Sequence, residues 1–155
     1  MKHSLISKRW LIAGLLVLVL CFGCVGTAQA VIIDRDGSLP AGEVVDDDLI
    51  LTANTINVDG TVNGDLIAAG ETVVINGKVT GNVIAAGASV TVNGEVGHDV
   101  FAAAAAVTVG PAARIGHNAY TTGASVESRA GSLIDGSLLI GAGQGLVSGQ
   151  ITNDL

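Results

Sequence analysis

The sequence predicts an all-β chain folded as a parallel β-helix, a solenoid in which each sequence repeat forms one coil. The first observation is a small polar residue followed by an aliphatic one, a pair that returns every 17 or 19 residues from Asp48 to Leu155. The second is that no helical period of apolar residues runs through these repeats. The third is a set of glycine-containing turns that divides each repeat into three short segments. A short, fixed period of this kind is typical of a β-solenoid.

Residues 1–30 have the order of a secretory signal peptide and are predicted to lie outside the solenoid. Basic residues precede an apolar stretch over residues 11–25, and the small residues Ala28 and Ala30 close the segment. This order predicts export, with cleavage after Ala30, to the periplasmic or extracellular face of the cytoplasmic membrane. An uncleaved anchor is the alternative, although the apolar stretch is short for a membrane span.

The chain beyond residue 30 carries few groups for chemistry. Both cysteines, Cys21 and Cys24, precede this point, so residues 31–155 have no thiol, no disulfide and no cysteine metal ligand. Residues 31–155 hold four basic and fourteen acidic side chains, a formal charge of −10. Such a charge repels nucleic-acid phosphates, so we expect no nucleic-acid partner.

Superposing the repeats aligns aliphatic residues in columns that are predicted to point into the solenoid. Two of these columns lie two residues apart, as alternation along a strand requires. Three strands per repeat predict a triangular coil, and six coils are expected over residues 45–155, after an irregular acidic segment at 31–44. Stacked coils lie about 4.8 Å apart. The first column consists of Leu49, Leu66, Val83, Val100, Ala119 and Leu138.

Asx-Gly pairs are predicted to form one corner of the coil. The glycines Gly60, Gly77 and Gly94 each follow an aspartate or asparagine. Such pairs supply the positive φ that a sharp corner often needs. The 19-residue repeats place their extra residues around Gly110 and around Arg129, at a single corner, which leaves the inward columns in register.

The sequence pattern of the repeats resembles that of the bactofilins, bacterial cytoskeletal proteins that form polymers. The resemblance rests on GDLIAAG at residues 64–70, VVINGKV at 73–79 and VTVNGEV at 90–96, and it covers residues 45–155. It implies a right-handed triangular β-helix whose copies stack end to end into non-polar filaments without nucleotide, often in association with membrane. Bactofilins act in the cytoplasm, so the signal peptide makes this chain similar to an exported variant of the family.

A column of small polar residues precedes the first aliphatic column. We expect a corner ladder, in which the side chains bond backbone N–H groups of neighbouring coils. The alternative is a Ca²⁺ site formed by Asp46, Asp47 and Asp48 with Asp65, because stacked carboxylates repel unless a cation neutralises them. The column consists of Asp48, Asp65, Asn82, Asp99, Asn118 and Ser137.

His98 and His117 occupy equivalent places in successive repeats and are predicted to lie one above the other. They are expected to be surface turn residues, because a catalytic zinc site needs three protein ligands and no third ligand has matching spacing. The alternative is a left-handed hexapeptide-type enzyme, an acyltransferase or a γ-type carbonic anhydrase, that uses both histidines. Repeats of 17 and 19 residues count against the strict 18 of that class, and no nucleophile, base and acid recur together. We therefore expect no enzyme and no cofactor.

One bulky apolar column is the candidate contact surface. The side chains of this column point outward if the columns on both sides of it point inward. They point inward if the first aliphatic column lies at the corner of the coil. The sequence does not decide between these two orientations. Val45 and Leu155 mark the ends expected to meet, with Ile140 and Ile151 in the last coil. The sequence thus predicts a structural homopolymer, with membrane or envelope proteins as further partners. The column consists of Ile50, Ile67, Ile84, Phe101, Tyr120 and Leu139.

Overall fold

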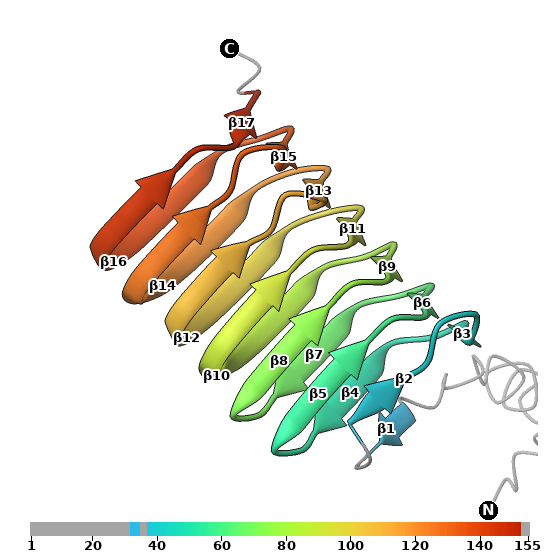
Figure 1. Cartoon of the computed structure of the whole chain (residues 1–155). Coiled ribbons are helices and arrows are strands. Elements are labelled where there is room, and N and C mark those ends of the chain that lie inside the picture. Colours follow the sequence, from blue (N-terminus) through green and yellow to red (C-terminus); the bar gives the residue numbers. More distant parts are fainter. Residues whose placement is uncertain (1–31, 35–36, 153–155) are drawn as a thin grey trace, which may run out of the picture. The chain divides into compact units, whose positions relative to one another are not determined.

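The computed structural model describes residues 32–34 and 37–152, and it confirms an all-β parallel β-helix (Figure 1). The predicted signal peptide and Leu155 lie outside the described residues. All strand pairs are parallel, and they form two sheets that wind around one core. None of the described residues belongs to a helix that could cross a membrane.

Each coil presents three faces. In the first three coils the first face contains β1 (Ile32–Asp34), β4 (Leu49–Thr52) and β7 (Leu66–Ala69). The second face contains β2 (Ser38–Leu39), β5 (Thr55–Val58) and β8 (Thr72–Ile75). In later coils one ten-residue strand bends around the corner and serves both faces. These strands are β10 (Val83–Val92), β12 (Val100–Val109), β14 (Ala119–Ser128) and β16 (Leu138–Val147).

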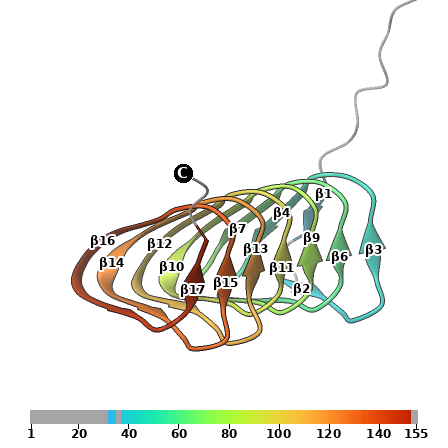
Figure 2. The same ribbon diagram turned by 90° about the horizontal axis from the view of Figure 1, so that it is seen from above.

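The third face is a ladder of two-residue strands. Seen along the stack, the two long faces meet at a rounded corner, and the short strands close the opposite side (Figure 2). The coil is therefore a flattened triangle. The strands are β3 (Val44–Val45), β6 (Thr61–Val62), β9 (Lys78–Val79), β11 (Glu95–Val96), β13 (Arg114–Ile115), β15 (Leu133–Ile134) and β17 (Gln150–Ile151).

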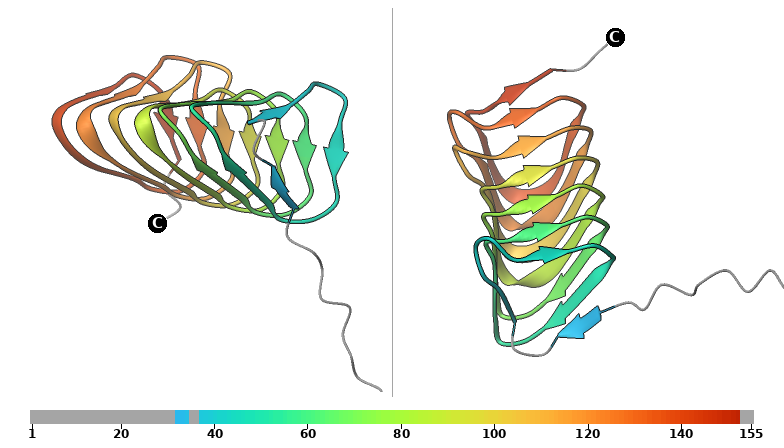
Figure 3. Two further views of the ribbon diagram at one scale, coloured as in Figure 1. Left: turned by 90° about the horizontal axis from the view of Figure 1, so that it is seen from below. Right: turned by 90° about the vertical axis from the view of Figure 1, so that its right-hand side faces the viewer.

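The solenoid has one coil more than the sequence predicts. Residues 31–44, expected to be irregular, contain strands that pair with the next coil, including Ile32 with Leu49 and Ser38 with Asn57. The corners here contain Gly37, which follows Asp36, and Gly42, which follows Ala41, both at positive φ. The backbone ladder forms although the side-chain motif is missing, so about seven coils are stacked (Figure 3).

As far as Ile134 the inward columns are buried as predicted. The described core runs from Leu39 to Ile134 and consists almost wholly of valine, isoleucine, leucine and alanine. Register is kept from coil to coil, as in Val83 opposite Val100 and Val96 opposite Ile115. Residues 31–155 form one compact unit that contains every described strand pair and the whole described core. This unit therefore has what it needs to fold by itself.

The glycines of the Asx-Gly pairs have a different role from the predicted one. Positive φ occurs, among the described residues, only at Gly37, Gly42 and Gly131, so the expectation for Gly77 and Gly94 was wrong. A Cβ atom on Gly77 would lie 1.9 Å from the carbonyl oxygen of Gly60, and one on Gly94 would lie 1.8 Å from that of Gly77. Glycine is required here because each corner closely approaches the backbone of the preceding coil.

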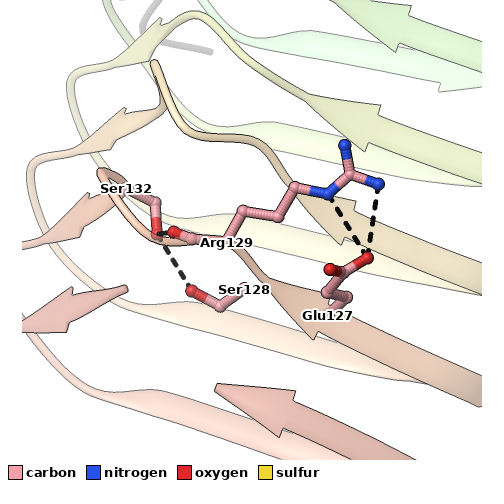
Figure 4. Close-up of polar contacts among 4 residues, drawn as sticks. All are labelled: Glu127, Ser128, Arg129 and Ser132. Carbon is pink, nitrogen blue, oxygen red and sulfur yellow. Dashed lines mark hydrogen bonds and ion pairs between the residues drawn. The ribbon is translucent and has the colours of Figure 1, made fainter. Parts of the chain in front are cut away.

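The two-residue insertions leave the columns in register, as predicted. At the second insertion the buried Ser128 and Ser132 share a hydrogen bond of 3.0 Å, and the Ser132 hydroxyl donates to the Arg129 carbonyl at 2.7 Å (Figure 4). Gly131 turns the chain at a φ of +99°. Beyond this corner Ile134 again pairs with Ile115 of the preceding coil.

Candidate assembly surfaces

The bulky apolar column points outward, which settles the orientation that the sequence left open. We call its six members the apolar ridge. Five of them expose between 38% and 63% of their surface, and the sixth, Ile50, is half-buried. The columns on both sides of the ridge are buried, as strand alternation requires. The ridge consists of Ile50, Ile67, Ile84, Phe101, Tyr120 and Leu139.

The aromatic members of the ridge stack on each other. The rings of Phe101 and Tyr120 have centroids 4.9 Å apart and planes 7° apart. Their residues pair directly in register between β12 and β14, so the spacing of the coils sets the spacing of the rings. Both residues remain exposed in spite of the stacking, Phe101 by 42% and Tyr120 by 38% of their surface.

A column of small residues runs beside the ridge, two positions later on the same face. We call it the small-residue strip. Between ridge and strip lies a hollow of about 560 Å³ that spans β10, β12, β14 and β16. No charged side chain lines this hollow. The strip was not predicted from the sequence, although the uniformly small size of its residues is visible in the repeats. The strip consists of Thr52, Ala69, Ala86, Ala103, Thr122 and Gly141.

The last described coil leaves part of its core exposed. Val147 and Ile151 belong to inward columns, yet they expose 46% and 39% of their surface. Leu138 and Ile140 are only partly buried against the core. Gly145 pairs with Val126, so it puts no side chain where the earlier coils have valine. Of the predicted contact residues, Ile140 and Ile151 thus lie at an open end of the core.

The N-terminal coil differs in its inward side chains. Leu39 and Val45 expose only 4% and 8% of their surface. Val45, which the sequence marked as one of two ends expected to meet, therefore offers little apolar area of its own. The outermost strands at the two ends are β1 and β16 in the first sheet and β3 and β17 in the second. Each of these strands pairs with a described strand on one side only.

The small polar column forms the predicted corner ladder. The Asp65 N–H donates to Asp48 Oδ1 at 2.8 Å, and the Asn82 N–H donates to Asp65 Oδ1 at 2.7 Å. The ladder continues through Asp99 and Asn118 to the N–H of Ser137. Each side chain thus holds the backbone of the following coil in place.

The acidic cluster proposed as a Ca²⁺ site is engaged in hydrogen bonds. Asp46 accepts from the Asn63 amide at 2.6 Å, and Asp47 accepts from the Asp48 N–H at 2.8 Å. Among the described residues no group of three or more histidine, cysteine, aspartate or glutamate side chains is placed to hold a metal ion.

His98 and His117 lie one above the other, as their equivalent positions predict. Their rings stack with centroids 5.2 Å apart and planes 18° apart, and both side chains are exposed. The described residues add no third ligand to the pair. This arrangement provides a histidine stack on the surface, without the ligand set of a catalytic zinc site.

Comparison with known proteins adds no assignment. No protein-family model, no curated protein and no solved structure matches this chain.

Proposed function

We propose that this chain is an exported, bactofilin-like structural protein that polymerises by stacking its solenoid end to end. The observation that carries the proposal is the uncovered core at the C-terminal coil. Val147 and Ile151 are exposed there at positions that every interior coil buries. Full burial of a valine or isoleucine side chain contributes about 1.5–3 kcal/mol.

The mechanism is β-augmentation between terminal coils. Strand β16 presents ten residues whose second edge pairs with no described strand, and β17 adds a shorter edge of this kind on the third face. Unpaired strand edges are templates for another strand, because each backbone N–H and C=O needs a partner. A second copy stacked on this coil supplies those partners and covers the open core at the same time. No nucleotide or metal takes part in this contact.

Export follows from the order of residues 1–30 alone, and membrane or envelope proteins remain expected partners on that basis. The strongly acidic residues 31–155 favour assembly through neutral surfaces, since like charges repel across an interface. The C-terminal coil satisfies this condition, because β16 and β17 contain no charged residue.

Sedimentation and electron microscopy of residues 31–155 test the proposal. At tens of micromolar we expect oligomers or filaments whose abundance rises with concentration, and we expect Ile140→Lys and Ile151→Lys to be monomeric at that concentration. Thr80→Lys adds the same charge at an exposed site of an interior coil and is expected to leave assembly unchanged. A wild-type protein that stays monomeric at tens of micromolar contradicts the proposal, as does equal loss of assembly in all three variants.

A further inference from the structure

From β4 to β16 the first face of the solenoid carries no charged side chain on its strands. Its outward positions are held by the apolar ridge and the small-residue strip. The second face carries Glu127, and the third carries Lys78, Glu95 and Arg114. An apolar face of this size is comparable to the largest apolar patch of a typical monomer, which is often functional.

We propose that this face binds the same face of a second copy, side by side, with the ridge of each copy lying on the strip of the other. Packed sheets lie about 10 Å apart. That distance suits a bulky side chain facing a small one better than two bulky side chains facing each other. The chain offers such pairs at every level, from Ile84 with Ala86 to Leu139 with Gly141.

The arrangement of ridge and strip selects the symmetry of the pair. A two-fold axis parallel to the solenoid axis exchanges the two columns, so the ridge of one copy meets the strip of the other. A two-fold axis across the solenoid keeps each column on its own side, so ridge would meet ridge. Only the first operation gives the complementary fit, and it makes the two solenoids run in the same direction. Such a contact is isologous, with the same surface used by both copies.

Charge favours the same symmetry and a copy of this chain as the occupant. The acidic corner ladder, which includes Asp65 and Asp99, lies directly before the ridge. In the parallel pair this ladder faces the corner that follows the strip, which is neutral at residues such as Gly87 and Ala104 and carries one acidic side chain, Glu71. In the antiparallel pair it would face the ladder of the other copy, and like charges placed together cost free energy. A membrane with anionic headgroups would face the same acidic side chains.

The size of the face sets the strength of the contact. Six coils about 4.8 Å apart and four residues about 3.3 Å apart make a face of roughly 29 by 13 Å, or about 380 Å² per copy. One pair therefore buries about 750 Å², below the roughly 1,200 Å² at which stable specific interfaces begin. Side pairing is thus weak between single copies. If copies also stack end to end, as proposed above, two stacked copies bury about 1,500 Å² and reach the standard range.

A charge-exchange experiment tests the pairing apart from the end contact. The background protein is residues 31–155 with Ile151→Lys. This substitution removes the end-to-end contact proposed above, and it lies outside the apolar ridge and the small-residue strip. Into it we introduce Ile84→Glu, Ile84→Lys or Ala86→Lys, all at exposed sites of β10. Circular dichroism checks that each variant is folded.

We expect the background protein to double its sedimentation mass at high micromolar concentration, and each charged variant to remain monomeric. A mixture of Ile84→Glu with Ala86→Lys should recover the doubled mass, because residue 84 of one copy faces residue 86 of the other. A mixture of Ile84→Glu with Ile84→Lys should not recover it. A background protein that stays monomeric overturns the proposal, whether or not it binds phosphatidylcholine vesicles. Recovery by the second mixture in place of the first also overturns it.

Discussion

Asp99 and Asn118 join successive coils through two hydrogen bonds to a single oxygen. The backbone N–H of Asn118 donates to Asp99 Oδ1 at 2.8 Å, and its side-chain amide donates to the same oxygen at 3.1 Å. The same relation links Asp65 with Asn82 two coils earlier. The polar column is therefore a structural ladder, which bonds the backbone of each coil to the side chain of the coil before it.

Removal of one rung should destabilise the fold. Asp99→Ala leaves the Asn118 N–H without its acceptor, and we expect a loss of about 1–3 kcal/mol in the free energy of unfolding. Asp99→Asn keeps an acceptor oxygen in place and should lose much less. Urea denaturation of residues 31–155 measures both variants. Equal losses for alanine and asparagine would show that the carboxylate charge, and not the hydrogen bond, holds the corner.

Chelation should leave the protein unchanged. The carboxylates of Asp46, Asp47 and Asp48 already accept hydrogen bonds from the protein, so the fold does not need a cation to satisfy them. We expect the same thermal unfolding midpoint with EDTA as with added Ca²⁺. A rise in the midpoint with Ca²⁺ that disappears in Asp47→Asn would restore the cation site as the better explanation.

Substitution of Gly94 should destabilise the fold, because the backbone of the preceding coil lies close to its Cα atom. An added Cβ would lie 1.8 Å from the Gly77 carbonyl oxygen, so the backbone must move, and we expect Gly94→Ala to cost about 1–3 kcal/mol or more. Gly141→Ala is the matched control, because its nearest contact would be Thr122 Oγ1 at 3.4 Å. Urea midpoints compare the two variants. Similar midpoints would contradict the close-approach explanation.

The buried serine pair should behave as one unit. Ser132→Ala leaves the Ser128 hydroxyl buried without its partner, and an orphaned polar group of this kind costs about 1–3 kcal/mol. The double variant Ser128→Ala with Ser132→Ala removes the orphan and should be no less stable than Ser132→Ala alone. Thermal or urea unfolding of the single and double variants provides the comparison. Strictly additive losses would mean that the two hydroxyls act independently.

Much of the fold could be predicted from the sequence because the same pattern of residues recurs in every repeat. Each inward column, such as Leu66, Val83 and Val100, recurs at a spacing that permits only one side-chain direction for the whole column. The insertion near Gly110 confirmed this, since register returns at Ile115 in the next strand. Repetition also predicted the polar ladder and the stacked histidines, since any residue type held at one repeat position is aligned by the solenoid.

The features that could not be predicted from the sequence are those that do not recur from repeat to repeat or that depend on contacts between coils. In the first coil Gly42 follows an alanine instead of an aspartate or asparagine, and the corners depend on the φ angles of Gly37 and Gly42. The role of Gly77 depends on a backbone contact with another coil, which a local turn rule does not include. The outward direction of the Phe101 side chain could not be predicted, because the sequence does not show which neighbouring column lies at the corner of the coil. The uncovered core at Val147 appears only when the stacking stops.

Hydrogen exchange in β16 tests end-to-end assembly most directly. Amides of this strand that do not bond to β14 have no described partner, so in a free monomer they should exchange rapidly. We predict that these amides within Leu138–Val147 become protected as the concentration of residues 31–155 rises, while Ile151→Lys keeps them unprotected at every concentration. Exchange in β16 that does not change with concentration would contradict assembly through the C-terminal coil.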